Sequence, residues 1–181
     1  ILDITKTPVS DITPLNDLPA LKKVLADETQ LSTFAADDFV RKNPEVLLIH
    51  HVKDLESWWA TLSPAWKSAL KRANPSITDE NPVVEILTQT VTVKDLDISG
   101  LEVATLKPII RFINLTEVNF SDNPIADLLP LSEVKTLKRI LGKNTKVQDL
   151  SVLKSNEALE FIDLQGSPVD KILPVVELPR L

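Results

Sequence analysis

The residues best suited to catalysis or metal binding are few in this chain of 181 residues. It contains two histidines, His50 and His51, and no cysteine. Adjacent residues on a helix point about 100° apart, so we do not expect these two rings to share a metal ion. Without cysteine there is no thiolate nucleophile, no disulfide and no Cys-ligated metal. We therefore expect neither a metal nor a cofactor.

Acidic residues are more numerous, but their positions indicate a structural role. Asp11, Asp127 and Asp149 stand in closely similar local sequences, and the last two are 22 residues apart. Acids that recur with a repeat are more typical of helix caps than of catalysts. The three glycines of the chain are too few for a phosphate-binding loop. We therefore do not expect an enzyme; if it were one, its carboxylates would be Asp95, Asp97 and Glu117.

Composition limits the classes of partner. Lys and Arg total 20 against 26 for Asp and Glu, which gives a net charge of -6. An acidic chain lacks the basic footprint of nucleic-acid binding. No apolar run approaches the roughly 18 residues that span a bilayer, so no direct membrane span is expected. With 43% apolar residues the chain can bury a core.

The elements that position these side chains recur every 22 residues. Each unit opens on a short apolar triplet and continues through an Asn/Thr/Ser-Pro-like step into a D-L-x-P-L-like segment. The triplets begin at Leu2, Val24, Leu96, Val118, Ile140 and Ile162. A later apolar slot is occupied by Ile12, Phe34, Leu128, Leu150 and Ile172.

This unit predicts a short strand followed by a turn and a helical turn. Alternation in the triplet points its first and third side chains inward and the others outward. The repeated Asp would be the N-cap of the helical turn, with Pro just inside it. One unit cannot bury its own inward face, so neighbouring units must stack with parallel strands.

The pattern resembles the leucine-rich repeat, in the 22-residue class of internalin-like bacterial and phosphatase-regulator-like proteins. The residues that carry the resemblance are Leu96, Ile98, Val118, Phe120, Asn123, Ile125, Leu128, Leu131, Ile140, Val147, Leu150, Leu153, Ile162, Leu164 and Val169. It implies an α/β fold, a right-handed solenoid with parallel β-strands on its concave face. Because the Asn123 slot holds Thr or Ser in other units, a continuous asparagine ladder is not expected.

A segment of different texture interrupts the array. Asn43-Pro44, Ser63-Pro64 and Asn81-Pro82 each combine a capping residue with proline at a first helical position. After the first two, apolar residues follow at helical spacing, from Leu47 to Trp59 and from Trp66 to Ala73. We predict an inserted helical hairpin that holds Trp58, Trp59 and Trp66. The predicted domains are N-terminal repeats over 1–34, the insertion over 35–81 and C-terminal repeats over 82–181.

The outward residues of the C-terminal triplets form the candidate binding face. They are Asp95, Asp97, Glu117, Asn119, Arg139, Leu141, Lys143, Phe161, Asp163 and Gln165. Leu141 and Phe161 would form an apolar centre rimmed by mixed charge, as interfaces often have.

The sequence thus predicts a non-catalytic module that binds a protein partner through the concave face. The alternative is a structural or assembly subunit that docks through the helical insertion or through uncapped ends. The terminal units carry no polar cap, so we expect a longer chain or a complex. We expect a bacterial protein, with the cell surface or periplasm favoured over the cytoplasm.

Overall fold

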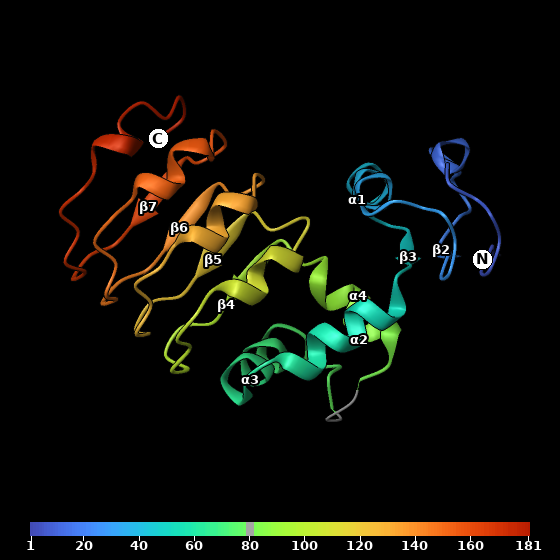
Figure 1. Cartoon of the computed structure of the whole chain (residues 1–181), viewed down its shortest axis with the longest axis horizontal. Helices are drawn as coiled ribbons and strands as arrows, with labels where there is room; N and C mark the ends of the chain where they lie inside the picture. Colours follow the sequence, from blue (N-terminus) through green and yellow to red (C-terminus); the bar gives the residue numbers. More distant parts are fainter. Residues whose placement is uncertain (79–81) are drawn as a thin grey trace. The chain divides into compact units, whose positions relative to one another are not determined.

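The computed structural model describes residues 1–78 and 82–181, so Asn81 and the helix start predicted there lie outside the described residues. The chain forms two compact units. Unit 1 comprises Ile1–Thr61 and the described part of 79–89, and unit 2 comprises Leu62–Thr78 and Thr90–Leu181. The α-helices and the strands from β2 to β7 are labelled in Figure 1. The predicted domain boundaries after residues 34 and 81 remain a proposal.

Unit 1 is built on three parallel strands, β1 (Leu2–Asp3), β2 (Lys23–Leu25) and β3 (Leu47–Ile49). Their register aligns the inward residues Leu2, Val24 and Leu48. The strands are joined by a short 3-10 helix, η1 (Thr13–Leu15), and by α1 (Thr33–Lys42). Unit 1 also contains α2 (Val52–Thr61) and most of α4 (Val84–Val91).

The third strand corrects the sequence interpretation. A helix was predicted from Asn43-Pro44, but Asn43 ends α1, where its N–H donates to the Phe39 carbonyl oxygen at 2.9 Å. Leu48 and Ile49 are buried in a strand that follows β2 by 24 residues. A helix begins only at Val52, whose N–H donates to the Asp27 carboxylate at 2.8 Å. The prediction was wrong because α1 lengthens this unit and moves the strand out of the 22-residue phase.

The same lengthening turns Phe34 outward. Its predicted slot is buried in Ile12 and Leu128, which are 3% and 2% exposed, whereas Phe34 is 78% exposed. In α1 the inward positions belong instead to Ala36, Phe39 and Val40. Phe34 therefore does not fill a buried position of the repeat, although its place in the sequence matches that of Ile12 and Leu128.

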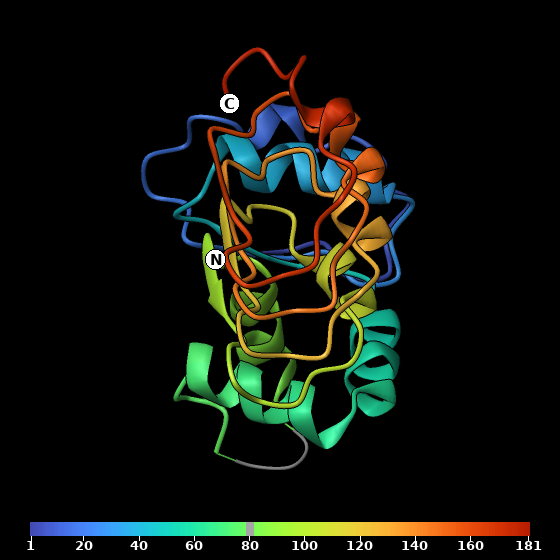
Figure 2. The same cartoon turned by 90° about the vertical axis from the view of Figure 1, so that its left-hand side faces the viewer.

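Unit 2 is a regular solenoid of four parallel strands in chain order. The strands are β4 (Asp95–Asp97), β5 (Glu117–Asn119), β6 (Arg139–Leu141) and β7 (Phe161–Asp163). Each strand is followed by a 3-10 helix, and these are η2 (Lys107–Arg111), η3 (Leu129–Glu133), η4 (Ser151–Ser155) and η5 (Leu173–Val175). Figure 2 shows the successive coils overlying one another with their short helices along one side. The 22-residue register aligns Leu96, Val118, Ile140 and Ile162, as predicted.

The repeated aspartates act one residue earlier than predicted. The N-caps of η1, η3 and η4 are Ile12, Leu128 and Leu150, and none of these side chains makes a capping bond. Instead the preceding Asp accepts a hydrogen bond at 2.8 Å from the backbone N–H two residues later, as in Asp127 with Leu129. This Asx turn still satisfies a donor at the start of each helical turn.

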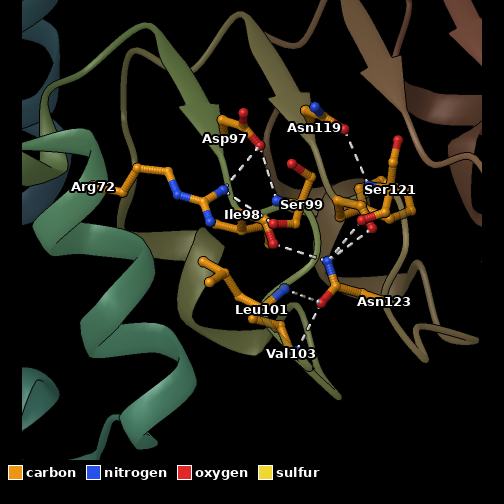
Figure 3. A network of polar contacts seen from close by, with 10 residues as sticks. Arg72, Asp97, Ile98, Ser99, Leu101, Val103, Asn119, Ser121 and Asn123 are labelled. Carbon is orange, nitrogen blue, oxygen red and sulfur yellow. Dashed lines mark hydrogen bonds and ion pairs between the residues drawn. The ribbon is translucent and has the colours of Figure 1, made fainter.

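Buried polar side chains hold neighbouring coils of unit 2 together. The Asn123 amide donates to the carbonyl oxygen of Ile98 at 2.8 Å and accepts from the N–H groups of Leu101 and Val103 (Figure 3). One coil later, the Thr145 and Ser167 hydroxyls lie 2.8 Å apart. The ladder thus changes from an amide to hydroxyls after Asn123.

The helix α3 (Pro64–Ala73) covers the first coil of unit 2. Its start agrees with the prediction, since the Ser63 hydroxyl accepts from the Trp66 N–H and Pro64 follows. Trp66 is 1% exposed, and its indole N–H donates to the Thr105 carbonyl oxygen at 2.8 Å. The helix thereby shields β4, which is an edge strand of its sheet.

Candidate binding face on strands β4 to β7

The outward side chains of unit 2 form two rows across its four strands. Strand register places Asp95, Glu117, Arg139 and Phe161 in one row and Asp97, Asn119, Leu141 and Asp163 in the other. These are the outward positions predicted from triplet alternation, and the central residue of each strand, such as Leu96 in β4, points inward. We call these two rows, with Lys143 and Gln165 beyond the strand ends, the strand face. It corresponds to the predicted concave face.

Arg139 organises the first row. Its Nε donates to Glu117 Oε2 at 2.8 Å, and its guanidinium carbon lies 4.4 Å from the centroid of the Phe161 ring. Phe161 is 37% exposed. The salt bridge and the cation–π contact hold the arginine from two sides while leaving about half of it in solvent. The apolar centre predicted from Leu141 and Phe161 is therefore shared with Arg139.

Lys143 and Asp163 join the ends of β6 and β7. Lys143 Nζ lies 3.1 Å from Asp163 Oδ2, and the Gln165 N–H donates to Asp163 Oδ1 at 3.1 Å. The Gln165 bond and then the lysine lower the pKa of Asp163 from its ordinary value. Leu141 lies directly opposite Asp163, so it is a diagonal neighbour of Phe161.

The β4 end of the strand face holds a cavity of about 320 Å³. Its lining residues are Arg72, Ala73, Asp95, Leu96, Asp97, Glu117 and Asn119. Arg72 reaches from the end of α3, donates to the Ser99 carbonyl oxygen at 3.0 Å and lies 3.8 Å from Asp97 Oδ1 (Figure 3). Sequence reasoning missed Arg72, because a basic residue in the last turn of a helix carries no sign of the strand it contacts.

The ionisable groups of the strand face are arranged for charge pairing. The carboxyl groups in the described ranges that shift clearly, such as Asp163, have their pKa lowered, the direction that keeps a carboxylate charged. A general acid needs the opposite shift. Residues 1–78 and 82–181 contain no group of three or more His, Asp or Glu side chains able to hold a metal ion.

The two histidines differ from the expectation in their local geometry. They lie between β3 and α2 rather than on a helix, and His51 has a φ of 47°. Their Nδ1 atoms are 2.8 Å apart, and the two rings meet edge to face with an interplanar angle of 69°. A ring nitrogen that shares a proton with its neighbour is not free to bind a metal ion.

Comparisons with known proteins show which proteins this chain resembles. No family model matches the chain. A rice protein (Oryza sativa subsp. japonica), acidic leucine-rich nuclear phosphoprotein 32-related protein 1, is 32% identical over 115 residues. The match covers 61% of this chain and 24% of that protein, so the chain spans about a quarter of the relative's length.

Among solved structures, an internalin (inlF) from Listeria monocytogenes is 23% identical with a TM-score of 0.58. The match covers 65% of this chain and 34% of the internalin. Internalin C2 of the same organism matches at 18% identity and a TM-score of 0.45, over 100% of this chain and 69% of its own. The inlF match confirms the predicted fold. The bacterial origin of the chain remains a proposal.

Proposed function

We propose that this leucine-rich repeat protein is a non-catalytic module that binds a protein partner through its strand face. The observation that carries the proposal is Arg139 stacked on Phe161 at the β6–β7 end of that face. Arginine and aromatic side chains are enriched among the residues that dominate binding energy at interfaces. Both are partly exposed here, and Glu117 already fixes the orientation of the guanidinium.

The charge distribution of the strand face supports a polar partner docked in one orientation. Asp95, Asp97 and Glu117 lie on β4 and β5, whereas Arg139 and Lys143 belong to the β6 coil. Complementary charges on a partner would fix its direction along the strands and speed its association.

A non-catalytic role of the strand face is supported at Asp163, whose lowered pKa is the opposite of the shift that a general acid needs. The alternative role is assembly through the helical insertion or the uncapped ends. Its support at the insertion is weaker because Trp59 and Trp66 are 3% and 1% exposed, whereas Trp58 is half-buried. Buried tryptophans stabilise their own unit and offer little surface to a partner.

No helix in residues 1–78 and 82–181 is long and apolar enough to cross a bilayer. A place at a bacterial cell surface or in the periplasm remains a proposal.

The test is capture of partners with wild-type chain and with the double variant Arg139→Glu/Phe161→Ala. We expect a partner that binds wild type and is lost from the variant by at least about tenfold, because the variant removes both anchors of one contact. A matched control is Lys154→Glu/Leu129→Ala, which reverses one charge and truncates one exposed apolar residue on the 3-10 helices.

Equal capture by wild type and Arg139→Glu/Phe161→Ala would contradict the proposal and move the contact elsewhere. Loss with the control variant as well would also contradict it. Circular dichroism of all three chains at the assay temperature shows whether each is folded.

A further inference from the structure

The exposed Phe34 lies beside a groove in unit 1. The groove has a volume of about 160 Å³, close to that of one amino-acid side chain. It is formed where η1 meets the first turns of α1 and is lined by Asp11, Ile12, Thr13, Asn16, Phe34, Ala35, Asp38 and Phe39. A single exposed aromatic residue needs no explanation on its own. Phe34, however, lines a groove that also carries two carboxylates, and this combination points to a binding site.

The groove combines an apolar floor with a negatively charged rim. Ile12 and Phe39 are buried at 3% and 2% exposure, and Phe34 stands beside them as an exposed wall. Asp11 and Asp38 supply two carboxylates. An apolar floor suits an aliphatic stem, and two carboxylates beside an aromatic face suit a positive charge.

Each carboxylate is held in place but not fully used. Asp11 Oδ1 accepts from the Thr13 N–H at 2.8 Å, and this bond lowers the pKa of Asp11, so the group is charged at neutral pH. Asp38 Oδ2 pairs with Lys42 Nζ at 2.7 Å within α1. Such an exposed i,i+4 pair is weak and yields readily to another cation.

We propose that this groove binds a basic side chain, lysine or arginine, of a protein partner. The stem would lie on Ile12 and Phe39, and the charged end would meet Asp11, Asp38 and the Phe34 ring. Charge complementarity selects this occupant, because the two carboxylates would repel an acidic side chain and would gain no ionic contact from a purely aliphatic one. The groove belongs to unit 1 and the strand face to unit 2, so this inference goes beyond the proposed function and does not depend on it.

The test uses acetylated, amidated Gly-Lys-Gly and Gly-Arg-Gly as probes of the intact chain. Binding is followed by the aromatic carbon and proton signals of Phe34 in NMR spectra. We expect saturable shifts with both peptides and at least about twofold weaker binding of Gly-norleucine-Gly, which has an aliphatic stem without the charge. We expect salt to weaken the basic peptides more than the norleucine peptide.

Two variants remove the proposed contacts with little risk to the fold. Phe34→Ala truncates an exposed ring and is followed by the shifts of the neighbouring Ala35 amide. Asp11→Asn keeps an oxygen that can accept from Thr13 and removes only the charge. Each should weaken the basic peptides about two- to fivefold. Asp127→Asn, which makes the same change before η3, is the matched control and should have no effect.

Three results would overturn the inference. They are norleucine peptide binding as tight as that of the lysine peptide, no Phe34 shift up to the solubility limit of the basic peptides, and equal weakening by Asp127→Asn. An acidic Gly-Glu-Gly peptide that binds as well as the basic ones would overturn it too. Capture of a partner through the strand face leaves each of these readouts unchanged, so the two proposals fail separately.

Discussion

At the scale of single residues, Gly142 shows how tightly neighbouring coils pack. A Cβ atom built on Gly142 would overlap the Phe120 ring of the preceding coil and approach Leu164 of the following one to 2.8 Å. Phe120 is fully buried and cannot swing away. Glycine is needed here for space, because the backbone of Gly142, unlike that of Gly100 and Gly166, does not have positive φ.

We expect Gly142→Ala to lower the free energy of unfolding by about 1 to 3 kcal/mol through overpacking. Urea unfolding of the single variants and of Gly142→Ala/Phe120→Leu would measure it. A smaller residue at 120 should remove part of the clash, so the double variant should be more stable than the sum of the two single losses predicts. Gly100→Ala is the control, since no atom lies within 4 Å of its added Cβ and only its φ of +63° is strained. Additive losses with Phe120→Leu would contradict the account of Gly142.

The lowered pKa of the Asp149 carboxyl predicts how the stability of the fold depends on pH at low pH. Hydrogen bonds from Ser151 and then from Lys171, whose Nζ lies 3.0 Å away, lower its pKa to about 2. The pKa in the unfolded chain is about 3.9. Because the folded value is the lower one, this contribution to stability is present above about pH 4 and is lost as the pH falls through about 2.

The carbon NMR signal of the Asp149 carboxyl should therefore titrate with a midpoint near 2. In Lys171→Ala the midpoint should rise but stay below the ordinary value, because the Ser151 contact remains. A midpoint near 4 in the wild-type chain would show that the Asx turn and the ion pair do not form in solution.

At the scale of elements, α3 is the cover of the first coil of unit 2. Trp66 fills the contact and bonds Thr105, Arg72 bonds Ser99, and the Asn74 amide donates to the Thr90 hydroxyl at 3.0 Å. These contacts protect β4, whose outer edge would otherwise present unpaired backbone groups.

We expect Trp66→Phe to cost about 1 to 2 kcal/mol, since the ring shrinks and the Thr105 carbonyl oxygen loses its indole donor. The loss should be local first, so hydrogen exchange should become faster over β4 and residues 99–103 before it changes at β7. Trp59→Phe, a buried tryptophan of unit 1, is the control and should leave exchange at β4 unchanged. Uniformly faster exchange in Trp66→Phe would argue against a capping role.

Most elements of unit 2 could be predicted from the sequence because the same pattern of apolar residues recurs every 22 residues. The triplets at Leu96, Val118, Ile140 and Ile162 align as predicted, since each unit must bury the same inward positions. The strand at Leu47–Ile49 was missed because α1 replaces a 3-10 helix and breaks that period. Helix-like spacing from Leu47 to Trp59 was coincidental, since apolar strand residues followed directly by a helix can mimic one longer helix.

At the scale of the whole molecule, the candidate site was predictable in its positions but not in its pairings. Alternation within each triplet gives the outward residues from Asp95 to Asp163. Alternation does not predict the hydrogen bond from Arg139 to Glu117 or the stacking of Arg139 on Phe161. The rotamer of a long side chain depends on its neighbours in the folded structure. Arg72 and the unit 1 groove lay further out of reach, because each depends on helices packed against repeats from distant parts of the sequence.

The chain passes between its two units three times, and this limits where it can be cut into fragments. The backbone passes from one unit to the other after Thr61, before residue 79 and after Gln89. A fragment that ends at Thr61 would lose Glu85, which forms a 2.8 Å salt bridge with Lys23 of β2. We expect no single cut to yield two self-sufficient halves. The units are therefore expected to be inherited, transplanted or engineered together, in contrast to ordinary repeat arrays that tolerate the loss of a coil from one end.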